Sequence, residues 1–122
     1  MSQSSDLGIK GEEFAADFLK NNGYKILSRN FRYGKYEIDI IAENNEFLVF
    51  AEVKTRADNP LDPPANAVTR DKQKAMIWAA EAYIKRYRID KESRFDVIVV
   101  LQKYEDDFSI EHIPYAFYPS LR

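Results

Sequence analysis

The sequence predicts one α/β domain with a central mixed β-sheet flanked by helices, in the order α-β-β-β-α-β-β. Three observations predict it: an amphipathic helix pattern at the start, two strand patterns joined by a short polar turn, and a long helix pattern followed by an almost continuous apolar run. The length of 122 residues, with 45% hydrophobic and 31% charged residues, is typical of a single globular domain covering 1–122. We expect flexibility only at 1–5 and 57–67.

The first helix is predicted from the apolar spacing near the N-terminus. Ser5 or Asp6 can cap it, and Gly23 supplies its C-terminal stop. The apolar residues that recur at helical spacing are Leu7, Ile9, Phe14, Ala15, Ala16, Phe18 and Leu19. This helix should therefore cover one face of a sheet.

Three strands are predicted after the first helix. Residues 24–32 form the first, and residues 36–42 and 47–55 form a hairpin whose turn contains Asn44 and Asn45. Asparagine tolerates the positive φ angles that tight hairpins require. The hairpin is the best-defined local feature of the sequence.

The second half of the chain is predicted to contain a helix, then a buried strand and then an edge strand. Prolines in 57–67 exclude a helix interior there, whereas 68–87 carries a long amphipathic helix pattern. The apolar run 95–101 should be a strand buried on both faces and parallel to 47–55, because a helical crossover joins the two. A last strand at 108–113 should lie at a sheet edge, and 114–122 is left as a loop or docking segment.

Composition restricts the chemistry that the chain can perform. The sequence has no cysteine and a single histidine, His112, which excludes disulfides, thiolate metal sites and histidine-rich zinc sites. Any bound metal must have oxygen ligands, which favours magnesium, manganese or calcium. No apolar run reaches the roughly 20 residues that cross a bilayer, and no secretory signal is present, so we expect a cytoplasmic protein without membrane contact.

The charge of the chain is segregated along the sequence. The net charge of −2 argues against nucleic-acid binding, but between Asp17 and Glu37 all charged residues are basic and alternate with aromatic residues. A second basic cluster lies within 70–88. Either cluster could follow a phosphate backbone, or could be an ordinary solvated face.

The hairpin places charged residues where a core strand should be apolar. Glu52 and Lys54 share a face of a strand that begins hydrophobic on both faces, and buried charges require partners. If the two asparagines form the turn, Asp39 lies opposite Phe50 and diagonal to Glu52, while Glu37 lies opposite Glu52. Asp39 and Glu52 could then share a cation.

Glu12 adds a third carboxylate from the first helix. Its helical register matches the apolar residues, so it should face the sheet, whereas Glu13 should face water. Three inward carboxylates and Lys54 are suited to metal-assisted phosphodiester hydrolysis. The alternative is a structural salt bridge of Lys54 with Asp39 or Glu52 that closes one end of the sheet.

Other polar residues allow two interpretations each. Lys72 and Gln73 could reach a phosphate near the sheet, or could simply belong to the end of an amphipathic helix. Glu37 could be an alternative ligand, but pairing with Arg32 or Lys35 is favoured.

The last two residues of interest are Asp96 and His112. Asp96 could support the carboxylate site from behind, or could cap the start of its strand. We expect His112 at the surface, because a metal-generated hydroxide needs no histidine base.

Several motifs carry a family resemblance. They are Gly8-x-x-Gly11-Glu12, Gly23-Tyr24, Arg29-Asn30, Glu37-Ile38-Asp39-Ile40-Ile41-Ala42, Phe50-Ala51-Glu52-Val53-Lys54-Thr55-Arg56, Lys72-Gln73 and Phe95-Asp96-Val97. Together they resemble the YraN-like predicted endonucleases, whose restriction-endonuclease-like fold is related to archaeal Holliday-junction resolvases. The resemblance implies a catalytic set of Glu12, Asp39, Glu52 and Lys54, in which the three carboxylates hold Mg²⁺ or Mn²⁺.

The sequence therefore predicts a magnesium-dependent endonuclease, a hydrolase that cuts DNA, with branched or recombination intermediates as candidate substrates. A resolvase-like role would require a symmetric homodimer. The rival interpretations are a non-catalytic nucleic-acid-binding module of the same fold and a protein-interaction domain with structural charges. The residues expected to contact nucleic acid are Arg29, Arg32, Lys35, Arg56, Lys72 and Gln73.

Overall fold

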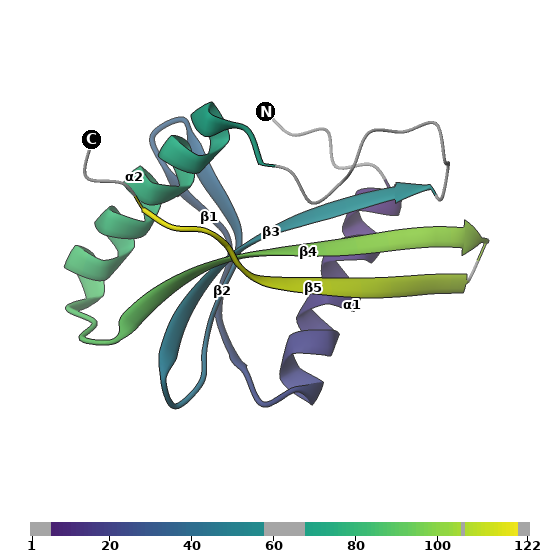
Figure 1. The fold of residues 1–122 in the computed structure, drawn as a ribbon, viewed down its shortest axis with the longest axis horizontal. Helices are drawn as coiled ribbons and strands as arrows, with labels where there is room; N and C mark the ends of the chain where they lie inside the picture. The colour runs from purple at the N-terminus through teal and green to yellow at the C-terminus, as the bar shows by residue number, and fades with distance from the viewer. Residues whose placement is uncertain (1–5, 58–67, 106, 120–122) are drawn as a thin grey trace.

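The computed structural model describes residues 6–57, 68–105 and 107–119. Its elements are α1 (Asp6–Asn21), β1 (Lys25–Tyr33), β2 (Tyr36–Glu43), β3 (Phe47–Ala57), α2 (Arg70–Tyr87), β4 (Glu92–Tyr104) and β5 (Asp107–Phe117). The strands form one five-stranded sheet in the order β1-β2-β3-β4-β5 (Figure 1). This arrangement confirms the predicted mixed α/β fold and its order of elements.

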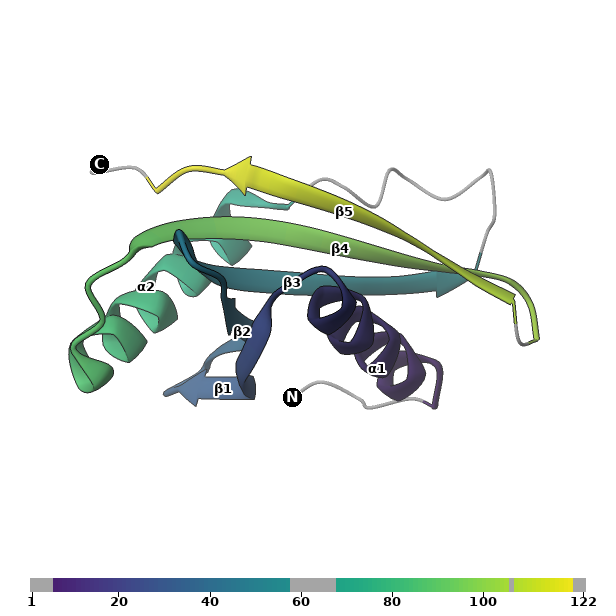
Figure 2. The same cartoon turned by 90° about the horizontal axis from the view of Figure 1, so that it is seen from below.

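The two helices cover opposite faces of the sheet (Figures 1 and 2). Alternate residues of β3 show this directly, because Phe50 packs with the α2 side and Ala51 with the α1 side. No helix in the described part of the chain is long and apolar enough to cross a membrane. Each helix is instead amphipathic and contributes one buried stripe.

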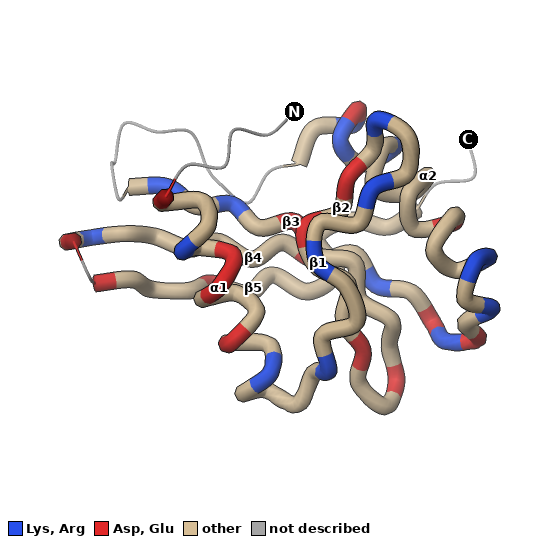
Figure 3. The backbone as a smooth tube through the Cα atoms, turned by 180° about the vertical axis from the view of Figure 1, so that it is seen from behind, with Lys and Arg blue, Asp and Glu red and all other residues tan. Residues whose placement is uncertain are grey.

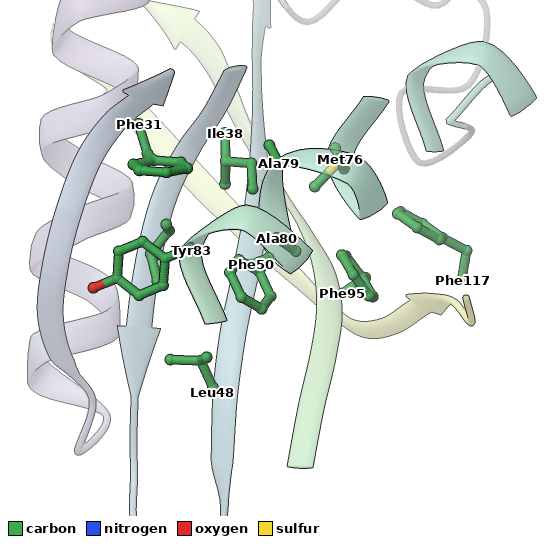
Figure 4. Packing of buried hydrophobic residues seen from close by; sticks show 11 residues of the cluster. Phe31, Ile38, Leu48, Phe50, Met76, Ala79, Ala80, Tyr83, Phe95 and Phe117 are labelled. Carbon is green, nitrogen blue, oxygen red and sulfur yellow. The ribbon is translucent and has the colours of Figure 1, made fainter. Parts of the chain in front are cut away.

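Aromatic residues dominate the core between α2 and the sheet (Figure 4). The ring of Tyr83 packs edge-on against Phe31, with 5.1 Å between the ring centroids. Phe50 stacks on Phe95 at 5.5 Å. The core under α1 is built from smaller residues, with Ala15, Ala16 and Leu19 among them. The smaller side chains allow α1 to lie close to the sheet.

The chain between β3 and β4 makes a parallel crossover. β3 and β4 pair in parallel from Phe47 beside Glu92 to Ala57 beside Gln102, as the sequence predicts. α2 begins at Arg70 because Thr69 caps it, its hydroxyl oxygen accepting from the Lys72 backbone N–H at 3.1 Å. The crossover therefore brings the start of α2 over the sheet.

Two boundaries differ from the prediction. β4 extends well beyond 95–101, and β5 continues to Phe117, so part of the expected loop 114–122 is strand. Pro114 is compatible with this because β5 is an edge strand, where a missing N–H costs no ladder bond on the open side. Residues 1–5 and 58–67, where flexibility was expected, lie outside the described residues, while Ala57 ends β3.

The register of the hairpin differs from the prediction by two residues. Phe50 lies opposite Ile41, and Ala51 lies opposite Ile40, so the predicted pairing of Asp39 with Phe50 is wrong. The cause is the side chain of Asn44, whose Oδ1 accepts from the N–H groups of Glu46 and Phe47 and widens the turn. Neither asparagine has a positive φ. A shift by two preserves the face of every side chain.

Candidate active site

Asp39 and Glu52 follow the last paired residues of the β2–β3 ladder. That pair is Ile40 and Ala51, so the two acids occupy the next position on each strand. Here a side chain replaces the backbone acceptor of the ladder, because the Oδ2 of Asp39 accepts from the Val53 backbone N–H at 2.8 Å. The corrected register therefore brings the carboxylates closer than a diagonal pairing would.

The electrostatic surroundings of Asp39 disfavour its ionised form. Burial, the largest cause, acts together with the negative charges of Glu52 and Glu12 to raise the pKa of Asp39 to about 7. The hydrogen bond from Val53 and the positive charge of Lys72 act in the opposite direction without compensating. Near neutral pH Asp39 is therefore only partly ionised, and a cation bound beside it would favour the ionised form.

Glu52 is held in place by charge but is incompletely hydrogen-bonded. Its side chain is 14% exposed, and its Oε1 lies 3.4 Å from the Lys72 Nζ. The same oxygen is buried without a hydrogen-bond partner among the described residues. An ion pair at this distance balances charge but leaves an acceptor unused.

Lys54 lies two residues after Glu52 on β3, and regular parallel pairing keeps both side chains on one face. It is half-buried. Within the described residues Lys54 forms no salt bridge with Asp39 or Glu52. The structural alternative, a Lys54 salt bridge that closes the sheet, is therefore not the arrangement observed; Lys72 pairs with Glu52 instead.

Glu12 faces inward and Glu13 outward, as the helical register predicts. Their side chains are 24% and 60% exposed. Gly11 makes this approach possible, because a Cβ at that position would collide with the side chain of Thr55 on β3. Arg29 binds both acids, at 3.6 Å from Glu12 and 3.2 Å from Glu13. α1 therefore delivers one carboxylate to the side of the sheet where Thr55 lies.

The donor set suits a hard divalent cation. Carboxylate oxygens are the ligands that magnesium and manganese prefer, and Figure 3 shows such acidic positions on α1, β2 and β3. In the parts of the chain described here, no three Asp, Glu or His side chains converge closely enough to enclose an ion as they stand. The fit to a cation thus rests on the raised pKa of Asp39, whose ionised form a bound cation would favour, and on the unused oxygen of Glu52.

The residues expected to contact nucleic acid are only partly available for it. Arg29 is committed to the acids of α1, and Arg32 lies 3.8 Å from Glu37 on the neighbouring strand. This pairing confirms the favoured partner of Glu37. The predicted place of Glu37 opposite Glu52 is wrong, because the β2–β3 register pairs Ile40 with Ala51 and so carries Asp39 to that position. Lys35 is exposed and has its ammonium 5.8 Å from the Tyr36 ring centroid.

The remaining three predicted contacts lie on β3 and α2. Lys72 neutralises Glu52, and the Gln73 side-chain amide donates to the Val68 carbonyl at 2.9 Å. Arg56 is half-buried near the end of β3. None of these six residues is contradicted as a ligand of nucleic acid, but the side chains of Arg29, Arg32, Lys72 and Gln73 would have to exchange the partners named above for it.

A buried polar network was missed by the sequence reasoning. Asp96 is fully buried and accepts from Arg94 Nη2 at 2.8 Å, and its Oδ2 lies 2.7 Å from His112 Nε2. Burial disfavours the charged carboxyl, but the hydrogen bonds from His112 and Arg94 outweigh it and lower the pKa of Asp96. Asp96 therefore neither caps its strand nor is solvated.

His112 consequently does not lie at the surface as expected. Its side chain is only 15% exposed, and it contacts the ring of Phe18 edge-on. A signal for this network was present, because Arg94 and Asp96 occupy alternate positions at the start of the otherwise apolar run 95–101. Such a pair on one buried face must satisfy itself or find a third partner.

Comparison with known proteins identifies relatives across nearly the whole chain. The profile of a family described as "Uncharacterised protein family UPF0102" matches residues 11–100. A UPF0102 protein of Bacteroides fragilis is 45% identical over 121 residues, covering 99% of both chains. Another of Prosthecochloris aestuarii is 44% identical over 119 residues, covering 93% of this chain and 94% of its own. The matched region contains all four residues of the candidate active site.

Proposed function

The chain belongs to the uncharacterised protein family UPF0102, and we propose that it is a divalent-metal-dependent endonuclease that hydrolyses DNA. The membership confirms the family named by the sequence motifs, and the nuclease activity is our inference from the site. A restriction-endonuclease-like fold and a cytoplasmic location belong to the same proposal. It is supported by a strand pair that carries Asp39, Glu52 and Lys54 at and beyond the point where the β2–β3 ladder ends.

The observation that carries the proposal is the pKa of Asp39, raised to about 7 by burial and by neighbouring carboxylates. Structural carboxylates normally gain compensating cations and keep a low pKa, as Asp96 does here. Groups whose charge is disfavoured by their own protein are concentrated at functional sites. A cation that binds Asp39 and Glu52 would supply the missing compensation.

The side chains have distinct roles in this proposal. Asp39 and Glu52 supply oxygens to Mg²⁺ or Mn²⁺, and Glu12 supplies a third carboxylate from α1. The bound ion would polarise the phosphate and lower the pKa of water. Lys54 positions its ammonium beside the carboxylates, where it can orient a phosphate oxygen or a water molecule.

A metal titration tests the site without requiring a substrate. Isothermal titration with Mn²⁺ should show one binding event in the wild type that is lost in Asp39→Asn and in Glu52→Gln. The matched control is Asp17→Asn, which removes an exposed carboxylate of α1 and should bind Mn²⁺ normally. Manganese binding that survives both site substitutions would refute the proposed ligands.

A cleavage assay tests the activity. Linear, nicked and four-way DNA are incubated with Mg²⁺ or Mn²⁺, with the Asp39→Ala variant in parallel. Metal-dependent products from the wild type alone would support the proposal, and preference for the four-way substrate would point to recombination intermediates. Equal survival of every substrate with both proteins would overturn the enzyme assignment.

The second candidate is a nucleic-acid-binding module of the same fold without catalysis. It is favoured by one observation, that no three acidic or histidine side chains of the described chain enclose a metal position. The titration separates the two candidates, since this module would bind DNA but would show no manganese binding dependent on Asp39. A protein-interaction domain would show neither.

A further inference from the structure

The outward side of α2 carries a row of basic residues with a tryptophan at its centre. Its members are Arg70, Lys74, Trp78, Glu81, Lys85 and, at the C-cap of the helix, Arg88, and we name this set the α2 stripe. At about 100° per residue, the five helical members fall within an arc of roughly 80°. All six residues are exposed. The stripe is therefore a continuous surface feature.

The α2 stripe lies opposite the face that α2 buries. Met76, Ala79, Ala80 and Tyr83 pack on the sheet, roughly half a helical turn away from the stripe. In Figures 1 and 2, one side of α2 rests on the sheet, and no other described element covers the opposite side of this helix. Among the described residues, the stripe is open to a partner along its full length.

The cations of the α2 stripe form no salt bridge within the part of the chain that the structure describes. Within the described residues, Arg70, Lys74 and Lys85 form no salt bridge, in contrast to Arg29 and Lys72. Four cations face one carboxylate in a chain whose net charge is −2. Figure 3 shows basic positions at both ends of α2. The surface is thus complementary to a polyanion.

Trp78 determines which polyanion fits. Its side chain is 56% exposed, and it is the single tryptophan of the chain. An exposed ring between cations is the arrangement that stacks an unpaired base while the cations bind the adjacent phosphates. Bases inside a duplex are stacked on one another and offer no free face to the ring. The chemistry therefore favours single-stranded over double-stranded nucleic acid.

The α2 stripe is connected to the candidate active site by the start of the helix. Arg70 lies two residues before Lys72, and the ammonium of Lys72 lies 3.4 Å from Glu52. At about 1.5 Å of rise per residue, Arg70 and Lys85 are roughly 22 Å apart along the axis, enough for several phosphates. A strand bound along the stripe would thus reach the end of α2 at which Lys72 contacts Glu52, although Arg70 and Lys72 point to opposite sides of the helix.

We propose that the α2 stripe binds single-stranded DNA, with phosphates on its cations and a base on Trp78. Binding of DNA to the α2 stripe does not depend on the proposed nuclease activity. The consequence of this binding does rest on that activity: the enzyme would select DNA that has an unpaired segment beside the cut. The substrate class is thus DNA with a flap, a gap or an open branch point.

Trp78 provides the primary measurement. Its intrinsic fluorescence is followed while an oligothymidylate of about 12 nucleotides, or a duplex of the same length, is added in the presence of EDTA. We expect quenching and saturation with the single strand, and markedly weaker binding without quenching for the duplex. No quenching by the single strand, or equal affinity for both, would overturn the proposal.

Charge reversal tests the cations, with binding followed by the anisotropy of a labelled oligonucleotide. Lys74→Glu with Lys85→Glu should weaken binding roughly tenfold or more and reduce the salt slope by about 1.4, since each lost contact contributes about 0.7. The control, Lys20→Glu with Lys103→Glu, changes the net charge equally at two exposed positions away from α2. Equal weakening by the control would refute a defined binding surface.

The stacking contact is tested separately from the charges. Trp78→Ala should weaken single-strand binding roughly tenfold with an unchanged salt slope, and Trp78→Phe should restore much of it. Failure of the stripe would leave manganese binding intact, whereas failure of the proposed activity would leave oligonucleotide binding intact in Asp39→Asn. Binding of an acidic protein in place of the oligonucleotide would also overturn the proposal.

Discussion

Replacing Asp39 by asparagine should stabilise the folded protein at alkaline pH while removing metal binding. The pKa of Asp39 rises from 3.8 to about 7 in the folded state, so the folded protein holds this proton more tightly than the unfolded chain. The resulting stability is fully present below the unfolded pKa of 3.8 and is lost as the pH rises through about 7. Asparagine has no charge to lose and keeps an oxygen for the Val53 N–H.

The size of the effect follows from the shift. At about 1.36 kcal/mol per pKa unit, the full shift corresponds to roughly 4 kcal/mol. Between about pH 5 and about pH 8.5, the wild type should lose about 3 kcal/mol of unfolding free energy relative to Asp39→Asn. The loss is smaller than the full value because the carboxyl of the unfolded chain is already ionised at pH 5, so part of the stabilisation is gone before the range begins. The difference is large compared with a typical domain stability of about 5–15 kcal/mol.

Urea denaturation at several pH values measures this difference directly. The free energy of unfolding of the variant minus that of the wild type should increase with pH and level off above about pH 8. Asp17→Asn, which changes an exposed carboxylate, should show no comparable trend. A difference that is independent of pH would refute the assignment of a buried, uncompensated carboxyl at Asp39.

Three further predictions concern the surroundings of the site. Gly11→Ala should destabilise the protein by about 1–3 kcal/mol, because the added Cβ would overlap the Thr55 side chain. In thermal unfolding, the additional substitution Thr55→Ala should recover part of this loss. Full stability of Gly11→Ala alone would contradict the close approach of α1 to β3. Asp96→Asn should cost about 3–5 kcal/mol in urea unfolding because it leaves buried Arg94 uncompensated, and a cost below about 1 kcal/mol would show the network to be dispensable. Its lowered pKa means that the wild type loses this stability as the pH falls through the folded pKa. Lys72→Met removes a positive charge that lowers the pKa of Asp39, so carboxyl NMR titration should find a higher pKa there; an unchanged value would disprove the electrostatic contact.

The faces of the elements could be predicted from the sequence because they follow from local periodicity. Alternation along β3 placed Glu52 and Lys54 together, and helical spacing separated Glu12 from Glu13. Ile9 shows the limit of that reasoning, since it shares the spacing of the buried residues but is 50% exposed, in the first turn of α1.

Features that depend on a single hydrogen bond or on distant segments could not be predicted in the same way. The register of the hairpin was set by the Asn44 side chain, which satisfies two backbone donors and lengthens the turn by two residues. The burial of His112 depends on Asp96, 16 residues earlier in the sequence and on the neighbouring strand. Hydrophobic spacing contains no information on such a partner, because both residues are polar.

The Asn44 turn also has a consequence for the order in which the protein folds. β2 and β3 are joined by this short turn, so their pairing closes a small loop, whereas β3 and β4 can pair only after the whole crossover has been ordered. We therefore expect the hairpin to belong to the folding nucleus and the β4–β5 network to form later. Asn44→Ala should slow refolding, while Asp96→Asn should mainly accelerate unfolding, and stopped-flow kinetics would distinguish the two. On this pathway Asp39 and Glu52 meet early, and the chain must complete its fold around two carboxylates that repel each other.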